Sequence, residues 1–481
     1  MFWRGVWGYL PANIVQGVVG FLTIVAFTRL LSAEEFGRYA LAFSVMTLAH
    51  VAVFSWLEAA MARFWAAQRT DLDTADHFAG LYRSAFAIGI VFLIVTTAVV
   101  LLAPLEPLFR WALAAGLYGA PIRCLVKLAQ ERYRAAGEVS RAAGLDMATA
   151  IGGLAIGVGF ALAGAGAAAP LIGLALAPLL TLPFILPGEW RRATGGVLDP
   201  VRMGDYARYG YPIAAGLSLA LVLASTDRFL LAAFMNEAAV GAYHAGYSIA
   251  NRTLDVLFVW LGAAGGPAMV MALERGGMER LKEAAREQAS TFMLIGLPAA
   301  VGVALVARPL AQFMVGEDLR DAAAVVTPWI ALSALLSGFT YYYVNQALTL
   351  GRRTGLLLPA MAVPAAANVV LNLLLIPRFG VLGAAWATAA SFAIGLAFSM
   401  ILTRRVMALP IPLDTLVRCG VACAVMAAAV APLPAIGGLP ELMLDASVGA
   451  AVYAAVALVL NAAGVRDLAL RLLARRKGAL A

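Results

Sequence analysis

Long apolar runs separated by short polar stretches make up most of the sequence. A helix needs about 20 apolar residues to cross the hydrocarbon core of a bilayer, and runs of that length recur along the chain. The pattern therefore predicts an all-α membrane protein with about fourteen transmembrane helices. Two separations, at Gly164–Ala167 and at Pro432–Pro434, contain no polar side chain and are the weakest in the pattern. The predicted helices cover approximately residues 10–31, 38–60, 81–103, 107–129, 144–164, 167–187, 211–234, 242–271, 289–307, 325–349, 355–376, 381–403, 414–432 and 440–462.

A polar motif between the first two apolar runs returns about 200 residues later. The first copy runs from Arg29 to Tyr39 and the second from Asp227 to Tyr243. Each places an arginine near the end of one apolar run, then an acidic residue or pair, then Gly-x-Tyr at the start of the next run. A repeat of this kind indicates a duplicated membrane protein, an architecture common among transporters.

The spacing of the two copies predicts how the halves are oriented. Six predicted helices separate them, and since six is even, both halves enter the membrane in the same sense. We therefore expect two parallel six-helix bundles around a central cavity, followed by two extra helices. The corresponding segments are 1–210, 211–410 and 411–481, the last ending in a basic tail with Arg475, Arg476 and Lys477.

Composition agrees with a membrane location. Hydrophobic residues make up 63% of the chain and charged residues only 13%, whereas globular domains carry about 25% charged residues. The net charge of +8 does not indicate a nucleic-acid partner, because the basic residues lie in short loops and not on a soluble domain. The bulk of the chain is therefore expected to lie in lipid.

The basic residues also predict orientation. Only six of the 35 lysines and arginines fall in odd-numbered loops, and five lie within or at the edges of predicted helices. The other 24 lie in the N-terminal segment, the even-numbered loops and the C-terminal segment. By the positive-inside rule, both termini are expected to be cytoplasmic. The eleven exceptions are Arg29, Arg38, Arg110, Arg308, Arg320 and Arg378 in the loops, and Arg123, Lys127, Arg228, Arg252 and Arg418 in the helices.

Several kinds of chemistry lack their sequence signatures. There is no Gly-rich phosphate loop of the Walker type, which argues against ATP and leaves a proton or sodium gradient as the alternative energy source. The three histidines and three cysteines have no metal-ligand spacing, so no metal or other cofactor is expected, and the cysteines are predicted to be buried thiols. An integral membrane enzyme, such as a sugar polymerase or ligase, is disfavoured because no outer loop is long enough for catalytic groups.

Three phrases of the sequence resemble the polysaccharide transporter (O-antigen flippase) family. That family belongs to the multidrug/oligosaccharidyl-lipid/polysaccharide exporter superfamily. Two of the phrases are the motif copies, and the third runs from Asn368 to Thr388, with paired asparagines, Ile-Pro-Arg-Phe-Gly and Gly-Ala-Ala. Each phrase alone is weak, but three in the family's order cover both halves of the chain.

The resemblance implies a flippase of the bacterial inner membrane. Its substrate would be a polyprenyl-diphosphate-linked oligosaccharide used for lipopolysaccharide, capsule or exopolysaccharide assembly, carried by alternating access. Membrane lipid and the polysaccharide polymerase machinery are the other implied partners. A drug/cation antiporter of the same superfamily is one alternative, although such proteins usually have twelve spans, and a lipid II flippase is another.

Cations inside the predicted helices are the candidates for holding a diphosphate in a wet cavity. Arg123 and Lys127 are four residues apart and share a helix face, with snorkelling to the cytoplasmic interface as the alternative. Arg252 lies deeper, with Asp255 nearly one turn on, so the pair either lines the cavity or forms a structural ion pair. Three amides are cavity candidates whose alternative role is to bridge helices: Asn251, Asn368 and Asn372.

Acids inside the predicted helices are the candidates for coupling, since a carboxylate can bind a proton or an ion. Glu58, Asp227 and Asp255 are available for this role. Asp227 and its neighbour Arg228 lie near the outer end of their helix, where we expect a gating or structural role before substrate contact. Arg29 of the first motif copy is a further gating candidate.

Overall fold

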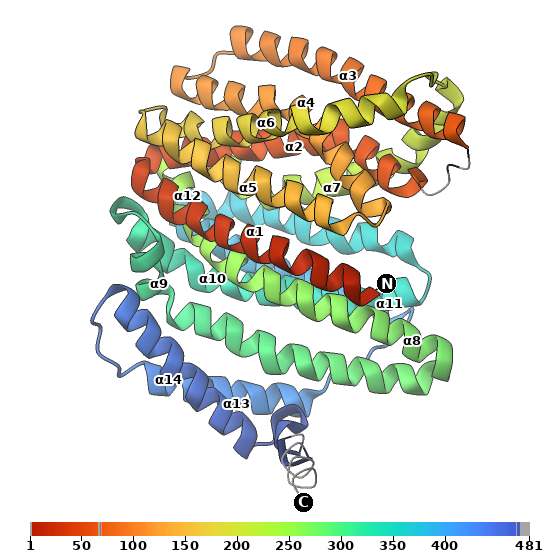
Figure 1. Cartoon of the computed structure of the whole chain (residues 1–481). Helices are drawn as coiled ribbons and strands as arrows, with labels where there is room; N and C mark the ends of the chain where they lie inside the picture. Colours follow the sequence, from red (N-terminus) through yellow and green to blue (C-terminus); the bar gives the residue numbers. More distant parts are fainter. Residues whose placement is uncertain (1, 66–67, 69, 468, 472–481) are drawn as a thin grey trace, which may run out of the picture. The chain divides into compact units, whose positions relative to one another are not determined.

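The computed structural model describes residues 2–65, 68, 70–467 and 469–471, and all regular elements in that part of the chain are helical (Figure 1). The predicted tail residues Arg475, Arg476 and Lys477 lie outside the described residues. The α-helices are α1 (Phe2–Leu30), α2 (Ala33–Phe64), α3 (Asp71–Leu102), α4 (Pro107–Ala135), α5 (Val139–Leu162), α6 (Ala169–Ala193), α7 (Pro200–Phe234), α8 (Glu237–Leu305), α9 (Ala307–Met314), α10 (Arg320–Phe339), α11 (Gln346–Leu350), α12 (Leu357–Arg404), α13 (Leu413–Val430) and α14 (Gly438–Val459). Short helical turns lie at Gly166–Ala168, Glu317–Leu319, Thr340–Val344, Thr354–Leu356 and Ala462–Gly464.

The chain divides by its internal contacts into two units, Met1–Gly241 and Ala242–Ala481. In the first unit α2 packs along both α4 and α7, and α5 packs along α1 and α6. In the second unit α10 packs on α12, and α13 pairs with α14, which also contacts α9. The bundle boundary at residue 210 remains a prediction of the repeat.

The helices are long and apolar enough to cross a membrane many times. Eleven described helices pass that test, and the bent α7 brings the number to twelve. Two of these twelve, α8 with 69 residues and α12 with 48, are too long for one crossing of about 20 residues. Each is interrupted by a non-helical glycine and folded back on itself, so each is long enough for two crossings. The predicted all-α membrane fold is confirmed.

A glycine with positive φ makes each fold-back possible. Gly277 has φ 66° and ψ −160°, and Gly380 has φ 56° and ψ −131°. Residues that carry a Cβ atom rarely adopt these backbone conformations. The arms then pack against each other. In α8 the rings of Phe258 and Phe292 stack with centroids 5.1 Å apart, and in α12 a Cβ on Gly395 would press on Pro364.

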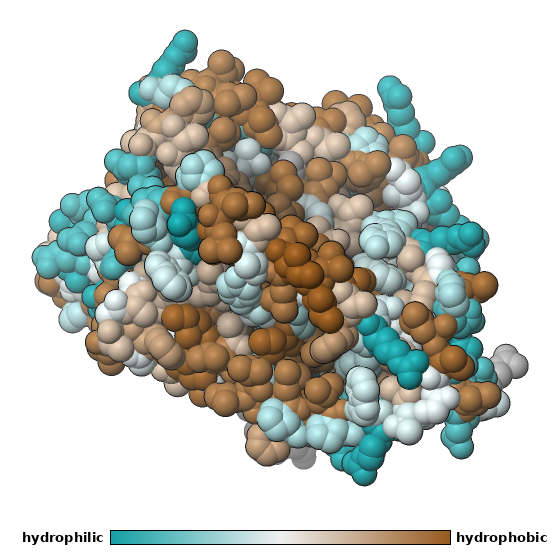
Figure 2. All heavy atoms as spheres, turned by 90° about the horizontal axis from the view of Figure 1, so that it is seen from above, coloured by the Kyte–Doolittle hydropathy of each residue, from teal (hydrophilic) through white to brown (hydrophobic). Residues whose placement is uncertain are grey.

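The surface of the helices suits lipid. Large apolar side chains point outward, among them Leu102 on α3 with 82% of its surface exposed and Phe184 on α6 with 88%. Figure 2 shows one face on which apolar side chains fill much of the middle while hydrophilic side chains gather towards the left and right margins. All three cysteines, Cys124, Cys419 and Cys423, are buried, as the sequence predicts.

Candidate functional site

A cluster of charged side chains lies inside the first unit, where α2, α4 and α5 meet. It contains three of the predicted site residues: Glu58 on α2, and Arg123 and Lys127 on α4. The charges of Arg123 and Lys127 both act on the Glu58 carboxylate. Lys127 Nζ also lies 3.7 Å from Asp146 Oδ1 on α5. The structure therefore gathers cations and acids from three helices into one site.

Glu58 has a second partner on its own helix. The Nε2 atom of His50 lies 2.8 Å from Glu58 Oε1, and the two atoms share a hydrogen bond. Both side chains are largely shielded, with 7% and 18% of their surfaces exposed. The sequence analysis did not select His50, because a spacing of eight residues corresponds to a rise of about 12 Å on a regular helix and does not predict a contact with Glu58.

Asp146 links this cluster to the predicted cytoplasmic end of α4. Its carboxylate is 5% exposed and accepts a hydrogen bond from Arg134 Nη2 at 2.8 Å. Arg134 also pairs with Glu131 at 2.5 Å. The acids Glu58, Glu131 and Asp146 balance the cations Arg123, Lys127 and Arg134 one for one. The sequence analysis missed Asp146 because it stands at the very start of its apolar run.

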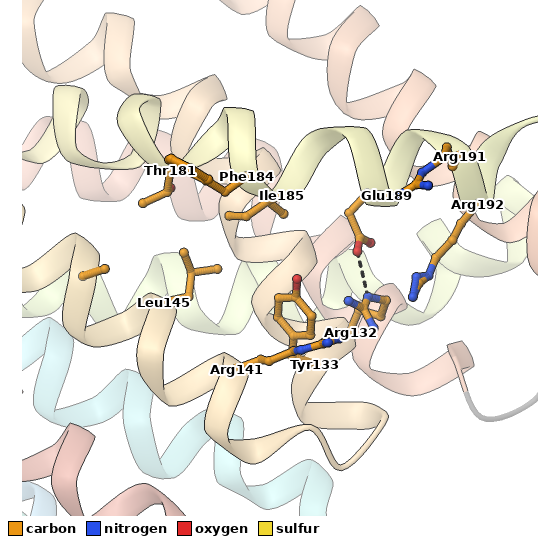
Figure 3. A pocket seen from close by; sticks show the side chains of 12 residues that line it. Arg132, Tyr133, Arg141, Leu145, Thr181, Phe184, Ile185, Glu189, Arg191 and Arg192 are labelled. Atoms are coloured by element: carbon orange, nitrogen blue, oxygen red, sulfur yellow. Dashed lines mark hydrogen bonds and ion pairs between the residues drawn. The ribbon is translucent and has the colours of Figure 1, made fainter.

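A second, deeply buried ion pair joins α4 to α6. Arg132 Nε donates to Glu189 Oε1 at 2.9 Å, and both side chains are 2% exposed. The Tyr82 hydroxyl on α3 donates to the other Glu189 oxygen at 3.2 Å, while Arg132 Nη1 donates to Glu138 Oε1 at 2.9 Å. Figure 3 shows Arg132 and Glu189 facing each other across the space between these helices. An ion pair thus joins the predicted cytoplasmic ends of α4 and α6, and the Tyr82 hydrogen bond joins α3 to them.

Glu138 stands in the loop between α4 and α5, outside the membrane-spanning segments. Partial burial works to raise the pKa of its carboxyl. Hydrogen bonds and charges from Arg132 and Arg141 outweigh that effect, so the pKa lies below its ordinary value of 4.5. Glu138 is therefore held in its ionised form by the arginines that it joins.

The two copies of the repeated motif meet inside the first unit. Ser32 and Glu35 form a capping box that starts α2. One turn further on, a Cβ on Gly37 would overlap the backbone oxygen of Glu237 and lie 3.1 Å from the backbone nitrogen of Gly241. A Cβ on Gly241 would in turn overlap the backbone oxygen of Ala33. Each Gly-x-Tyr glycine is needed because the other segment lies directly against it.

The gating candidates lie shortly before the two contacting segments in the sequence, at the ends of α1 and α7. Arg29 is exposed in the last turn of α1. Asp227 and Arg228 are buried near the end of α7, with 2% and 6% of their surfaces exposed. The Arg228 backbone N–H donates to Asp227 Oδ1 at 2.9 Å, so the adjacent pair is stabilised locally.

The second unit holds the remaining candidates in two places. On the first arm of α8, Arg252 and Asp255 are exposed and Asn251 is half-buried, and the charge of Arg252 acts on Asp255. On the first arm of α12, Asn372 Nδ2 donates to Asn368 Oδ1 at 2.9 Å. These two amides are 0% and 7% exposed, so both are buried in this structure.

Comparison with known families identifies the chain. The model of the polysaccharide biosynthesis protein family matches residues 26–324, more than half of the sequence. The chain belongs to this family. The match contains the motif copies and the whole charged cluster of the first unit. No curated protein sequence matches the chain.

Solved structures agree on the fold of this polysaccharide biosynthesis protein. The lipid II flippase MurJ in an inward closed conformation is similar with a TM-score of 0.76 at 12% identity, over 96% of this chain and 99% of that one. A multidrug resistance MATE family transporter of the MOP superfamily is similar in its inward-facing conformation, with a TM-score of 0.58 at 17% identity, over 81% of this chain and 95% of that one. Its outward-facing counterpart has a TM-score of 0.59 at 14% identity, over 84% and 95%.

The family is that of polysaccharide biosynthesis proteins, and the fold is shared with the lipid II flippase MurJ and with MATE family transporters. Within this frame, the cluster around Glu58 is a set of cations whose charge is offset by neighbouring carboxylates. An incoming anion can exchange with a carboxylate as the partner of Arg123 or Lys127. A proton can do the same by neutralising one of the acids.

Proposed function

We propose that the protein flips a polyprenyl-diphosphate-linked oligosaccharide across the bacterial inner membrane for polysaccharide assembly. The observation that carries this proposal is the cluster of Arg123 and Lys127 with Glu58 and Asp146, held among membrane-spanning helices of a polysaccharide biosynthesis protein. The diphosphate would bind Arg123 and Lys127, because anionic oxygens and cationic N–H groups form the strongest hydrogen bonds available there.

The acids of the cluster provide a route to coupling. With every group ionised, the cations and acids offset one another, so the diphosphate must compete with Glu58 and Asp146 for its partners. A proton on either carboxylate removes that competitor and favours the substrate. A proton gradient could therefore bias loading on one side of the membrane against the other.

The repeated motif supports alternating access. Gly37 and Gly241 hold α2 against the first turn of α8, on what the charge distribution predicts to be the outer side. We propose that this contact closes the outer side, and that substrate release requires α2 and residues 237–241 to separate. Asp227 and Arg228 are buried on α7, about ten residues before Glu237 in the sequence, and would move with α7 in that step.

Transport of the defined substrate in proteoliposomes tests the proposal. The lipid-linked oligosaccharide carries a fluorescent label, and a membrane-impermeant quencher reports how much reaches the other leaflet. Arg123→Gln should slow transport at least tenfold, because it removes one of the two cations proposed to hold the diphosphate. Arg208→Gln is the matched control, since Arg208 is 86% exposed and pairs only with Asp205 among the described residues.

Two results would overturn the proposal. One is wild-type transport by Arg123→Gln and Lys127→Gln together, and the other is no transport by the wild-type protein. A second candidate, lipid II, is favoured by the similarity to MurJ over nearly the full length of both chains. Lipid II in the same assay separates the candidates: faster transport of lipid II than of the oligosaccharide lipid would reassign the substrate.

A further inference from the structure

A cavity of about 610 Å³ opens between α4, α5 and α6, separate from the cluster around Glu58. Figure 3 shows that its lining is divided along the helices. Arginines, Tyr133 and Glu189 gather at one end, whereas Leu145, Thr181, Phe184 and Ile185 gather at the other. Nothing in the proposed transport cycle uses this cavity.

The polar end lies where three helices finish or begin. Arg132 is in the last turn of α4, Arg141 is in the first turn of α5, and Arg191 and Arg192 are in the last turn of α6. The apolar end lies deeper. Phe184 is eight residues before Arg192 on α6, a rise of about 12 Å. The cavity therefore runs from the interface predicted to be cytoplasmic into the hydrocarbon layer.

Two of the four arginines are neutralised by protein groups. Arg132 bonds to Glu189 and Glu138, both at 2.9 Å, and Arg141 bonds to Glu138 at 2.6 Å. Two acids thus offset two arginines. The other two, Arg191 and Arg192, form no ion pair within the described part of the chain, and both are exposed. The cavity is left with two unbalanced positive charges.

Arginines in the last turn of a helix also offset the helix dipole, but that role needs no cavity beside them. Here the same two arginines line a space whose other end is apolar and faces outward through Phe184, which is 88% exposed. Such a combination of cationic head space and apolar tail space, at the membrane interface, matches a lipid with an anionic phosphate headgroup.

We propose that this cavity binds an anionic phospholipid of the inner leaflet. Arg191 and Arg192 contact the phosphate oxygens, and the part of the acyl chains nearest the headgroup lies against Leu145, Phe184 and Ile185. The Arg132–Glu189 pair forms the rigid floor of the headgroup site. The site is independent of the transported substrate, so it stands or falls separately from the flippase proposal.

Native mass spectrometry of the purified full chain measures lipid binding directly. The lipids are phosphatidylglycerol, zwitterionic phosphatidylcholine, and a polyprenyl diphosphate without sugar, with inorganic phosphate as the soluble probe. We expect phosphatidylglycerol to be retained in preference to phosphatidylcholine. The variant R191Q/R192Q should bind it about tenfold to thirtyfold more weakly, because two interfacial cations are lost.

Two further variants separate the effect of these two arginines from a general loss of charge and from the shape of the cavity. R352Q/R353Q removes an adjacent, exposed arginine pair from the other unit and should bind like the wild type. Gly188→Leu keeps every charge but fills the cavity, since a Cβ on Gly188 meets no atom within 4 Å. It should reduce phosphatidylglycerol binding as strongly as the loss of the arginines does.

The outcomes decide the proposal. Reduced binding in both R191Q/R192Q and Gly188→Leu supports it. Unchanged binding in both variants, equal retention of phosphatidylcholine, or displacement by inorganic phosphate alone overturns it. Preferential binding of the polyprenyl diphosphate, lost in the same variants, also overturns it and assigns the cavity to the transported lipid.

Discussion

At the scale of single residues, the charges buried in the first unit are stabilised by partners on other helices. Arg132 is 2% exposed and tolerates that environment because Glu189 and Glu138 accept its hydrogen bonds. Lys127 and Arg134 depend in the same way on Asp146. A buried charge that loses its partner is costly, so these positions should respond strongly to neutral substitutions.

Glu189→Gln should lower the stability of the detergent-solubilised protein by about 3 kcal/mol, because it leaves the buried Arg132 with only one acid. Thermal or chemical unfolding of the purified protein measures the effect. Asp205→Asn, which breaks the exposed pair with Arg208, should change stability little. Equal stability of both variants would mean that the buried pair does not hold α4 to α6.

Glu138 predicts a dependence on pH. Its pKa in the folded protein lies below its ordinary value of 4.5 because of Arg132 and Arg141. A carboxyl with a lowered folded pKa adds stability that is fully present above its unfolded pKa and is lost as the pH falls through its folded pKa. The stability difference between the wild type and Glu138→Gln should therefore shrink as the pH drops below about 4.5.

Unfolding of both proteins between pH 7 and pH 3 checks that prediction. Glu279→Gln, at a side chain that is 84% exposed, serves as the control for general effects of acid. A stability difference that stays constant, or grows, as the pH falls would show that the two arginines do not lower the pKa of Glu138.

At the scale of helices, the close contact at Gly37 is the most sensitive point. Gly37→Ala should destabilise the protein by about 1–3 kcal/mol, because the new methyl group overlaps the Glu237 backbone oxygen. Gly216→Ala on α7 meets nothing within 4 Å and should be neutral or slightly stabilising, as alanine is the better helix former. Unfolding measurements on the two variants compare them directly, and equal stabilities would exclude the contact.

Much of the helix inventory can be predicted from apolar run lengths, and the reason is physical. A helix of about 20 apolar residues matches the thickness of the hydrocarbon core, so runs of this length indicate helices that cross the bilayer. Even the turns at Gly277 and Gly380 fall between predicted runs. The partners of the buried charges could not be predicted: Asp146 lies 19 residues from Lys127, and Glu189 lies 57 from Arg132. Their pairing depends on how α4, α5 and α6 pack, which no local pattern contains.

At the scale of the whole molecule, the orientation predicted from the basic residues can be measured. Single cysteines replace Thr194, after α6, and Pro104, between α3 and α4. An inner-membrane-impermeant maleimide applied to intact cells should label Pro104→Cys and spare Thr194→Cys, since Thr194 is predicted to be cytoplasmic. The native cysteines are buried, so they contribute little background. The opposite labelling would invert the proposed direction of transport.

The division of the chain at Gly241 has a consequence for its history. The boundary falls inside α8, five residues after that helix begins, and not in a loop. If the repeat arose by duplication, α8 now belongs to both units. Its first turn packs against α2 in the first unit, and its remainder lies in the second unit. A gene cut at the Met235–Asn236 turn would therefore remove residues 237–241 from the first copy. Gly37 would then lose the backbone of Glu237 and Gly241 against which it packs.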